Sequence, residues 1–248
     1  MNRLAVVVLL SFVLSLFGCG ESAKPKQRPQ TATNTATNQA TVAAPTNETT
    51  FPKPDLAAVE KEIRDCFARY KEAIMNGRGK EAAEYVDQAT IEWYRQSLEW
   101  AKSAKRHEVE AMPFMDKMQV LMIRSRIPKE KVLSMSGKEF FIYGVDSGMV
   151  SKDSVEKIGG VSKVSSIHEN FAKTKMLHDG KEAPFGFSFT FEEGQWKLNI
   201  PSVFLIASQA IKTVVKEMEM TEDQFIFSSL EHATGKKPTD SLWEPLVP

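Results

Sequence analysis

The sequence predicts an α+β protein, with a helical first half, an antiparallel sheet and closing helices. Two observations support this class. Through about residue 130, apolar residues recur every three or four positions, which is the spacing of one face of a helix. Between Phe185 and Ile200 they recur at every second position, which is the spacing of one face of a strand. Helices first and strands later favour α+β over an alternating α/β fold.

Residues 1–18 have the pattern of a secretory signal peptide. Asn2 and Arg3 form a short positive start, and Leu4 to Phe17 follow without a charge. This apolar run is too short for the roughly 20 residues that a helix needs to span a bilayer. A positive start and a short apolar run indicate export instead.

Residues 16–19, Leu-Phe-Gly-Cys, resemble the lipobox of bacterial lipoproteins, although Phe17 replaces the usual small residue. The resemblance implies a diacylglycerol on the Cys19 thiol, cleavage before Cys19 and acylation of the new amino group. Gly20 is not an inner-membrane retention signal, by resemblance to enterobacterial lipoproteins. We therefore expect a lipid anchor in the cell envelope, on the periplasmic face of the outer membrane if the cell has one. The alternative is an ordinary secreted protein with a free cysteine.

Residues 19–54 are expected to form the lipidated cysteine and a disordered tether. The stretch 31–50 contains eight threonines and few apolar residues, so it has too little apolar surface to offset its ordering entropy. Lys24, Lys26 and Arg28 lie close to the expected lipid. They either attract an anionic leaflet or serve solubility only.

Residues 55–248 are expected to form a single globular domain. The formal net charge of the whole chain is zero, and no basic stripe favours nucleic acid as a partner. The chain has two cysteines. Because Cys19 is expected to carry lipid, Cys66 has no partner for a disulfide, and its helical spacing with apolar neighbours predicts a core thiol.

Helices are expected in two groups. The first begins with a long helix that ends at Asn76-Gly77, a typical C-terminal stop. The first group covers about 55–75, 80–87, 90–104 and 113–126, a helix after Pro128, and a short one at about 151–158. The second group closes the chain at about 202–219 and 222–234.

A hairpin is predicted where the apolar period changes. Phe185–Glu192 and Gln195–Ile200 alternate, and Glu193-Gly194 between them reads as a two-residue turn. The phenylalanines share one face, and small and polar residues share the other. The expected pairs are Phe191–Trp196, Phe189–Leu198, Phe187–Ile200, Thr190–Lys197 and Glu192–Gln195.

Residues 164–177 read as one longer strand, with Asp179-Gly180 as a second hairpin turn. This register places His168 opposite Phe191 and Asn170 opposite Phe189. Polar side chains among apolar ones inside a sheet are typical of a ligand site, so His168 and Asn170 are the candidate ligand-binding residues. The alternative is that both are hydrogen-bonded core residues or lie at an open rim.

Three stretches resemble the nuclear transport factor 2-like (SnoaL-like) family: YKEAIMNG at 70–77, KEAAEYVD at 80–87 and FEEGQWKLNI at 191–200. The resemblance covers about 55–105 and 160–200, and it implies a curved sheet that forms a cone around a long helix, with a pocket at the open end. The inserted helices at about 108–158 and the final helices depart from the family pattern. The family contains isomerases, dehydratases and non-enzymatic binding domains, so the fold does not decide the function.

The sequence indicates no catalytic residue, no metal site and no cofactor. Two strings begin like a zinc helix, at His107-Glu108 and His168-Glu169, but alanine stands where each second histidine is needed. Met112, Met115, Met118 and Met122 recur at helical spacing. Thioethers outside the cytoplasm can bind Cu(I), but we expect these four to pack in the core.

We therefore expect a lipid-anchored, non-catalytic module of the envelope, which binds a small apolar ligand or an envelope protein. The alternative is a small-molecule isomerase, lyase or hydrolase that uses the cone-shaped pocket. A convergent acid and base inside that pocket would distinguish the enzyme from the binding module.

Overall fold

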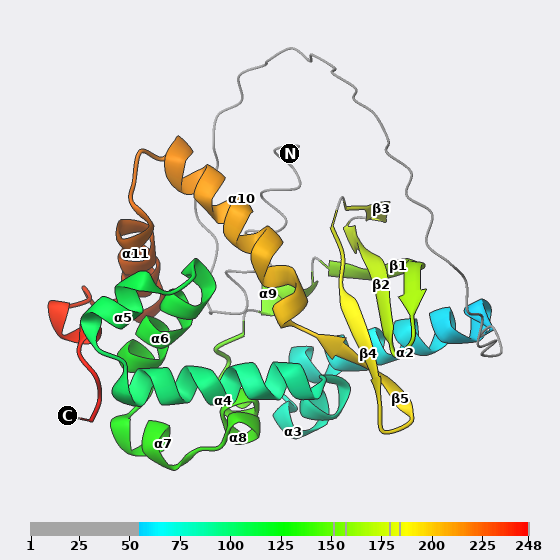
Figure 1. The fold of residues 1–248 in the computed structure, drawn as a ribbon, viewed down its shortest axis with the longest axis horizontal. Coiled ribbons are helices and arrows are strands. Elements are labelled where there is room, and N and C mark those ends of the chain that lie inside the picture. The colour runs from blue at the N-terminus through cyan, green and yellow to red at the C-terminus, as the bar shows by residue number, and fades with distance from the viewer. Residues whose placement is uncertain (1–54, 151, 157, 179, 184, 248) are drawn as a thin grey trace, which may run out of the picture.

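The structure is a computed structural model that describes residues 55–150, 152–156, 158–178, 180–183 and 185–247. It is an α+β fold, as predicted: helices come first, a five-stranded antiparallel sheet follows, and helices close the chain. Figure 1 shows the sheet and helix α2 on one side of the molecule and most other helices on the other side. The predicted signal peptide, Cys19 and the tether lie outside the described residues.

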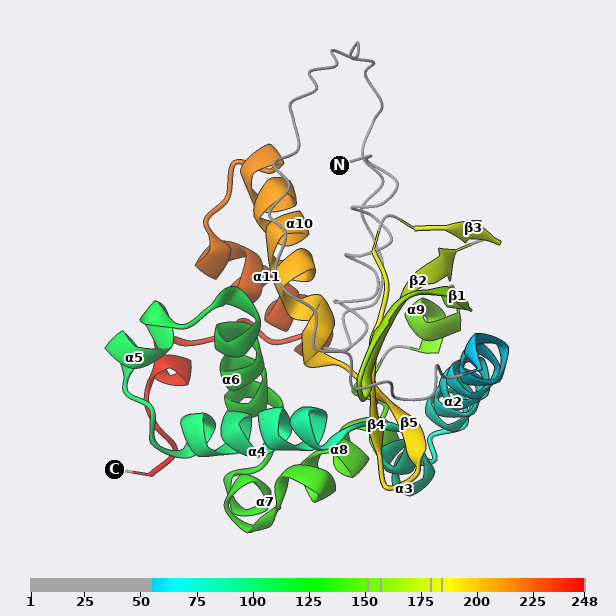
Figure 2. The same ribbon diagram turned by 45° about the vertical axis from the view of Figure 1, so that its right-hand side comes forward.

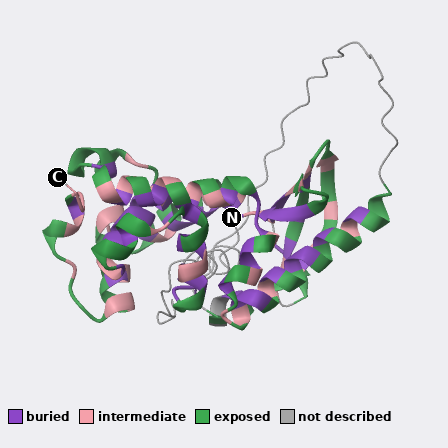
Figure 3. Ribbon diagram, turned by 90° about the horizontal axis from the view of Figure 1, so that it is seen from below, coloured by how far each residue is buried: buried purple, intermediate pink, exposed green. Residues whose placement is uncertain are grey.

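Helix α2, Leu56–Met75, begins and ends where the sequence predicts. The Asp55 carboxylate caps its start by accepting from the backbone N–H of Ala57 at 3.0 Å. Gly77, with φ of 64°, follows its end in a conformation that favours glycine. Figure 3 shows buried and exposed residues alternating along this helix, which is the pattern of an element that buries one face.

Further helices follow α2 before the sheet begins. Their bounds are α3 Gly79–Ala82, η1 Ala83–Tyr85, α4 Gln88–Ser103, α5 Arg106–Ala111, α6 Phe114–Arg126, α7 Lys129–Ser134, α8 Gly137–Asp146 and α9 Lys152–Glu156. Helices α5 and α8 are not predicted by the sequence pattern. Helix α6 contacts α4, α5, α10 and α11, and ten of its residues are buried, so it is the central helix of this region (Figure 2).

The sheet contains β1 Ile158–His168, β2 Phe171–His178, β3 Lys181–Glu182, β4 Ser188–Glu192 and β5 Gln195–Asn199. The strand order is β1-β2-β4-β5, and β3 pairs with β2. Four predicted pairs of the β4–β5 hairpin are confirmed, including Phe189 with Leu198 and Phe191 with Trp196. The predicted pair Phe187–Ile200 lies just beyond the ends of both strands.

The predicted single strand over 164–177 is wrong. The chain turns at Glu169 and Asn170, so β1 and β2 form a hairpin in which His168 pairs with Phe171. Glu169 has φ of 51°, a conformation that a tight turn requires and that is uncommon for glutamate. The turn therefore removes His168 and Asn170 from the strand that pairs with β4.

The predicted register between β2 and β4 is also wrong, by two residues. The Asp179-Gly180 turn does pair Leu177 with Glu182 as expected. Beyond it, Ala183 N–H donates to the Met176 carbonyl, and Met176 N–H donates to the Phe185 carbonyl. The register of the ladder therefore shifts by two positions between the bond of Ala183 and that of Phe185. Ala172 consequently pairs with Phe189.

A shift of two residues keeps every side chain on its predicted face. The apolar face of the sheet therefore still carries Phe187, Phe189 and Ala172, and α2 packs against it through Phe67, whose ring lies 5.0 Å from that of Phe187. Helix α2 contacts both β1 and β5.

The opposite face of the hairpin is buried more than the alternating pattern suggests. Ser188 and Lys197 are only 6% and 8% exposed. Ser188 N–H donates to Ser202 Oγ at 3.3 Å, in the short helix η2, Pro201–Val203. Helix α10, Phe204–Glu217, continues from η2 and leads to α11, Glu222–Thr234, and η3, Asp240–Trp243. Within the part of the chain that the structure describes, none of the helices has the length and apolar character to cross a membrane.

Candidate functional site

A groove of about 520 Å³ runs between α2 and the beginning of β1. Helix α2 contributes one stripe of side chains at helical spacing: Arg64, Phe67, Ala68, Lys71, Glu72 and Met75. The sheet contributes Gly159, Gly160, Val161 and Leu177. The volume lies within the roughly 300–1,000 Å³ that small-molecule sites occupy, so this groove is the candidate binding site.

The floor of the groove is apolar. Phe67 and Val161 are each 4% exposed, and Phe67 is supported from below by Phe187. Gly159 and Gly160 form the facing wall without side chains. Gly160 has φ of 149°, which L side chains rarely adopt, and a Cβ there would point into open space. A larger residue at this position would therefore be strained and would narrow the groove.

Lys71 is the cation at the centre of the groove. Its Nζ donates to the backbone carbonyl of Glu156 at 3.0 Å and to that of Ile158. Desolvation lowers the pKa of Lys71, and the nearby charge of Glu156 opposes this effect. An ammonium group has three donors, so its two bonds to described residues leave one for a ligand.

The other charged groups of the groove have partners on the protein. Arg64 forms a 3.6 Å ion pair with Glu60, and Glu60 also accepts from the backbone N–H of Val164 at 3.1 Å. Glu72 pairs with Arg78 at 2.9 Å. The lining thus carries two cations and one carboxylate, and the carboxylate is occupied by an arginine outside the groove.

Cys66 borders a smaller hollow of about 250 Å³ on another side of α2. Its thiol is 7% exposed and donates to the Tyr85 carbonyl at 3.7 Å. Burial raises the pKa of the thiol to about 12. The thiolate is the reactive form of cysteine, so the raised pKa makes Cys66 a poor nucleophile. Its burial makes it a core residue, as the sequence predicts.

Asp87 is a buried carboxylate, 1% exposed, where α4 begins beside the sheet. One oxygen accepts from Thr90 N–H at 2.8 Å and Thr90 Oγ1 at 2.7 Å. The other accepts from Thr190 Oγ1 at 2.9 Å and Asn199 Nδ2 at 2.6 Å. Four donors fill the lone pairs of a carboxylate, so Asp87 joins the helices to the sheet and has no acceptor site left for a ligand.

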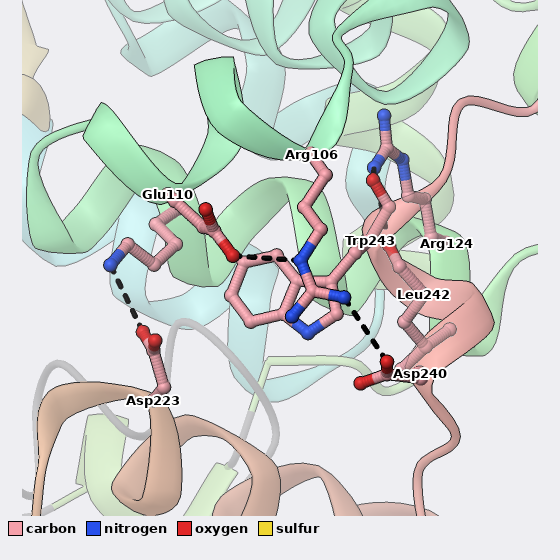
Figure 4. Close-up of polar contacts among 8 residues, drawn as sticks. Arg106, Glu110, Arg124, Asp223, Asp240, Leu242 and Trp243 are labelled. Carbon is pink, nitrogen blue, oxygen red and sulfur yellow. Dashed lines mark hydrogen bonds and ion pairs between the residues drawn. The ribbon is translucent and has the colours of Figure 1, made fainter.

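Arg124 holds the end of α4 and the C-terminal segment together (Figure 4). Its guanidinium is 8% exposed and donates to five backbone carbonyls: Trp100, Ala101, Ala104, Leu242 and Trp243. Desolvation lowers its pKa to about 10, against the smaller influence of Glu244. All of these partners are backbone atoms of the protein, so this cluster is structural.

Arg106 and Lys117 make further contacts with the C-terminal part of the chain. Figure 4 shows Arg106 over the Trp243 ring, and its guanidinium carbon lies 5.6 Å from the ring centroid. Arg106 also pairs with Glu110 at 2.8 Å and with Asp240 at 3.1 Å. Lys117 of α6 pairs with Asp223 of α11 at 3.0 Å. These ion pairs join η3 to α5 and α11 to α6.

The predicted ligand residues do not reach the groove. His168 and Asn170 are both exposed, at the turn between β1 and β2. The register that placed them opposite Phe191 and Phe189 is wrong, because the turn at Glu169 and Asn170 ends the strand there. Binding by these two residues stays a prediction.

The methionine stripe is buried as expected. Met115, Met118 and Met122 are 2%, 1% and 3% exposed, and Met112 packs against the core from its edge. Across the described residues, no group of three or more His, Cys, Asp or Glu side chains is placed to hold a metal ion.

The sequence contains two features of the groove that become informative only once the fold is known. Arg64 and Lys71 flank Phe67 on one face of a helix, and Gly159-Gly160 begins the strand that packs there. The two glycines were interpreted only as the end of a helix. Their role becomes visible once β1 is placed beside α2.

Comparisons with models of known protein families, with characterised proteins and with solved structures each find no match to this chain. The resemblances to bacterial lipoproteins and to the nuclear transport factor 2-like family therefore stay predictions from the sequence.

Proposed function

We propose that this chain is a lipid-anchored binding module of the bacterial cell envelope that holds a small ligand in the groove between α2 and β1. The observation that supports ligand binding is the groove itself, with its volume of about 520 Å³ and its apolar floor. The lipobox-like residues 16–19 support the anchor.

The charged side chains that line the groove are already engaged by other protein groups, which favours binding over catalysis. An isomerase, lyase or hydrolase needs a convergent acid and base. In the groove, Glu72 is engaged by Arg78 and Lys71 donates to two backbone carbonyls. The groove therefore offers shape and charge to a ligand rather than an acid and base pair.

The test is to fill the groove without disturbing the core. Ala68 lines the groove and is exposed, so Ala68→Trp should occupy the ligand volume while the protein stays folded. The probe is the neutral fluorophore N-phenyl-1-naphthylamine, titrated into the wild-type chain. We expect saturable, one-to-one fluorescence enhancement with the wild type and at least a tenfold weaker affinity with Ala68→Trp.

The matched control is Ala58→Trp, which places the same side chain at an exposed position of α2 outside the groove. It should bind the probe like the wild type. Binding by Ala68→Trp that equals the control, or no saturable binding by the wild type, would contradict the proposed site.

A further inference from the structure

The groove is long and follows one helix. Its lining on α2 extends from Arg64 to Met75, which is about 16 Å along a helix at 1.5 Å per residue. Phe67, Met75 and Leu177 supply apolar surface along this length, and Gly160 leaves the facing wall without a side chain. A groove of this form fits an extended apolar chain better than a compact ring.

The charges of the groove lie at defined points along this length. Arg64 stands at one end and Lys71 two turns further along α2. Both hydrogen bonds that Lys71 makes to described residues go to backbone carbonyls, which leaves one of its three ammonium donors for a ligand. The charge of Glu156 lies near enough to act on the pKa of Lys71, but Glu156 does not line the groove. Arg64 is held by Glu60 only at 3.6 Å, and its side chain is 47% exposed.

The one carboxylate of the lining does not cancel this charge. Glu72 is paired with Arg78 at 2.9 Å, outside the groove. An anionic group between Arg64 and Lys71 would therefore meet two cations and no free carboxylate among the lining residues.

We infer that the ligand of this groove is a single-chain amphiphile with an anionic head group, bound by Lys71 and Arg64 through the head and by Phe67, Met75 and Leu177 through the chain. This inference rests on the proposed function, because it specifies the ligand of the same site.

The experiment measures displacement of N-phenyl-1-naphthylamine by three probes of equal chain length, each below its aggregation concentration. The probes are dodecanoate, 1-dodecanol and dodecyltrimethylammonium. We expect dodecanoate to bind at least tenfold more tightly than dodecanol and the cationic probe to bind most weakly. Lys71→Met should weaken dodecanoate about tenfold and leave dodecanol within twofold.

Two further variants separate charge from folding. Arg64→Gln changes an exposed side chain and should weaken dodecanoate three- to fivefold even if Lys71→Met disturbs the start of β1. Lys61→Met removes a cation from the same helix outside the groove, where Lys61 is 74% exposed, and should change nothing.

The outcomes distinguish this inference from the proposed function. Equal binding of dodecanoate and dodecanol, unchanged by Lys71→Met and Arg64→Gln, would overturn the anionic head group and leave the groove as a neutral apolar site. Preference for the cationic probe would also overturn it. If N-phenyl-1-naphthylamine binds and Ala68→Trp abolishes its binding, but no probe displaces it, the inference fails alone; if the fluorophore does not bind either, both proposals fail.

Discussion

Asn199 donates a 2.6 Å hydrogen bond from Nδ2 to Oδ2 of Asp87, which lies 112 positions earlier in the chain. The backbone supports the same junction, because Asp87 N–H donates to the Leu198 carbonyl at 3.0 Å. One buried carboxylate thus connects the start of α4 with the last strand of the sheet. The helices and the sheet are therefore expected to unfold in one cooperative transition.

Asp87→Asn should lower the free energy of unfolding by about 1–3 kcal/mol, because an amide presents N–H groups where the carboxylate accepts and leaves a buried donor unpaired. Urea denaturation followed by circular dichroism measures this loss. Asp65→Asn is the control, because Asp65 is 51% exposed and pairs only with Lys61. Equal losses in the two variants would show that the Asp87 junction does not stabilise the fold.

Arg124→Met should lower the free energy of unfolding by at least about 3 kcal/mol, since it leaves five backbone carbonyls without their donor. Arg124→Lys keeps the charge but has three donors instead of five, so it should lie between Met and the wild type. The measurement is the urea midpoint of each variant. Arg95→Met, at an exposed arginine of α4, should be nearly neutral; a comparable loss there would refute the assignment.

Phe189→Ala should cost about 3–5 kcal/mol, because Phe189 is fully buried in the core. Phe191→Ala removes the same ring from the same strand at a position that is 41% exposed, and should cost clearly less. Ser188→Lys should also destabilise the protein, since Ser188 is 6% exposed. A neutral Ser188→Lys would mean that this face of the hairpin is open.

The Cys66 thiol should react slowly in the folded protein. In a Cys19→Ser chain Cys66 is the single thiol, and burial raises its pKa from 9.0 to about 12. At pH 8 this leaves about 1,000-fold less thiolate than in the unfolded chain. Reaction with a disulfide reagent, with and without guanidinium, tests this ratio; equal rates would contradict the buried placement.

The same shift predicts a pH dependence of stability. The folded state keeps the Cys66 proton between pH 9 and about 12, where the unfolded state releases it. The folded state therefore binds more protons in this window, and the contribution of Cys66 to stability falls as the pH rises through it. In the Cys19→Ser background, Cys66→Ala should flatten this part of the profile in urea titrations at each pH. An unchanged slope would count against the raised pKa.

Cys19→Ser should release the protein from membranes, because the proposed acyl chains attach to this residue and each buried CH₂ contributes about 0.8 kcal/mol to anchoring. Fractionation after a high-salt wash measures the distribution. Cys66→Ser, which removes the other cysteine, should stay with the membrane. Membrane retention of the Cys19→Ser chain would contradict the lipid anchor.

The elements with a strong local signal were predictable from the sequence. Helix α2 has a capping aspartate, one apolar face and a glycine stop, and the β4–β5 hairpin has a two-residue turn between alternating strands. In both cases the residues that determine where the element begins and ends are close to one another in the sequence. Helix α8 was missed because Gly137 and Gly144 lower helix propensity, while burial of Phe140 and Phe141 stabilises it in the fold.

The candidate site depended on long-range placement, which the sequence pattern does not contain. The turn at Glu169 and Asn170 interrupts an alternating run and places the positive φ on a glutamate, so Asn170 alone was too weak a signal to predict it. The next register then shifts by two positions between the bond of Ala183 and that of Phe185. The groove arises only when β1 lies beside α2, and neither element alone indicates it.

Arg124 also makes the packing of α6 depend on the C-terminal segment, because two of its five acceptors lie there. Protein synthesis makes this arginine 118 positions before Leu242, the first of its two acceptors in the C-terminal segment. Until that segment arrives, two donors of the guanidinium must remain hydrated or be buried without acceptors, while the bonds to Trp100, Ala101 and Ala104 can already form. A chain that is cut short before η3 would lack two of the five bonds and the contact of η3 with α6, so truncated products should be degraded by proteases faster than the longer chain.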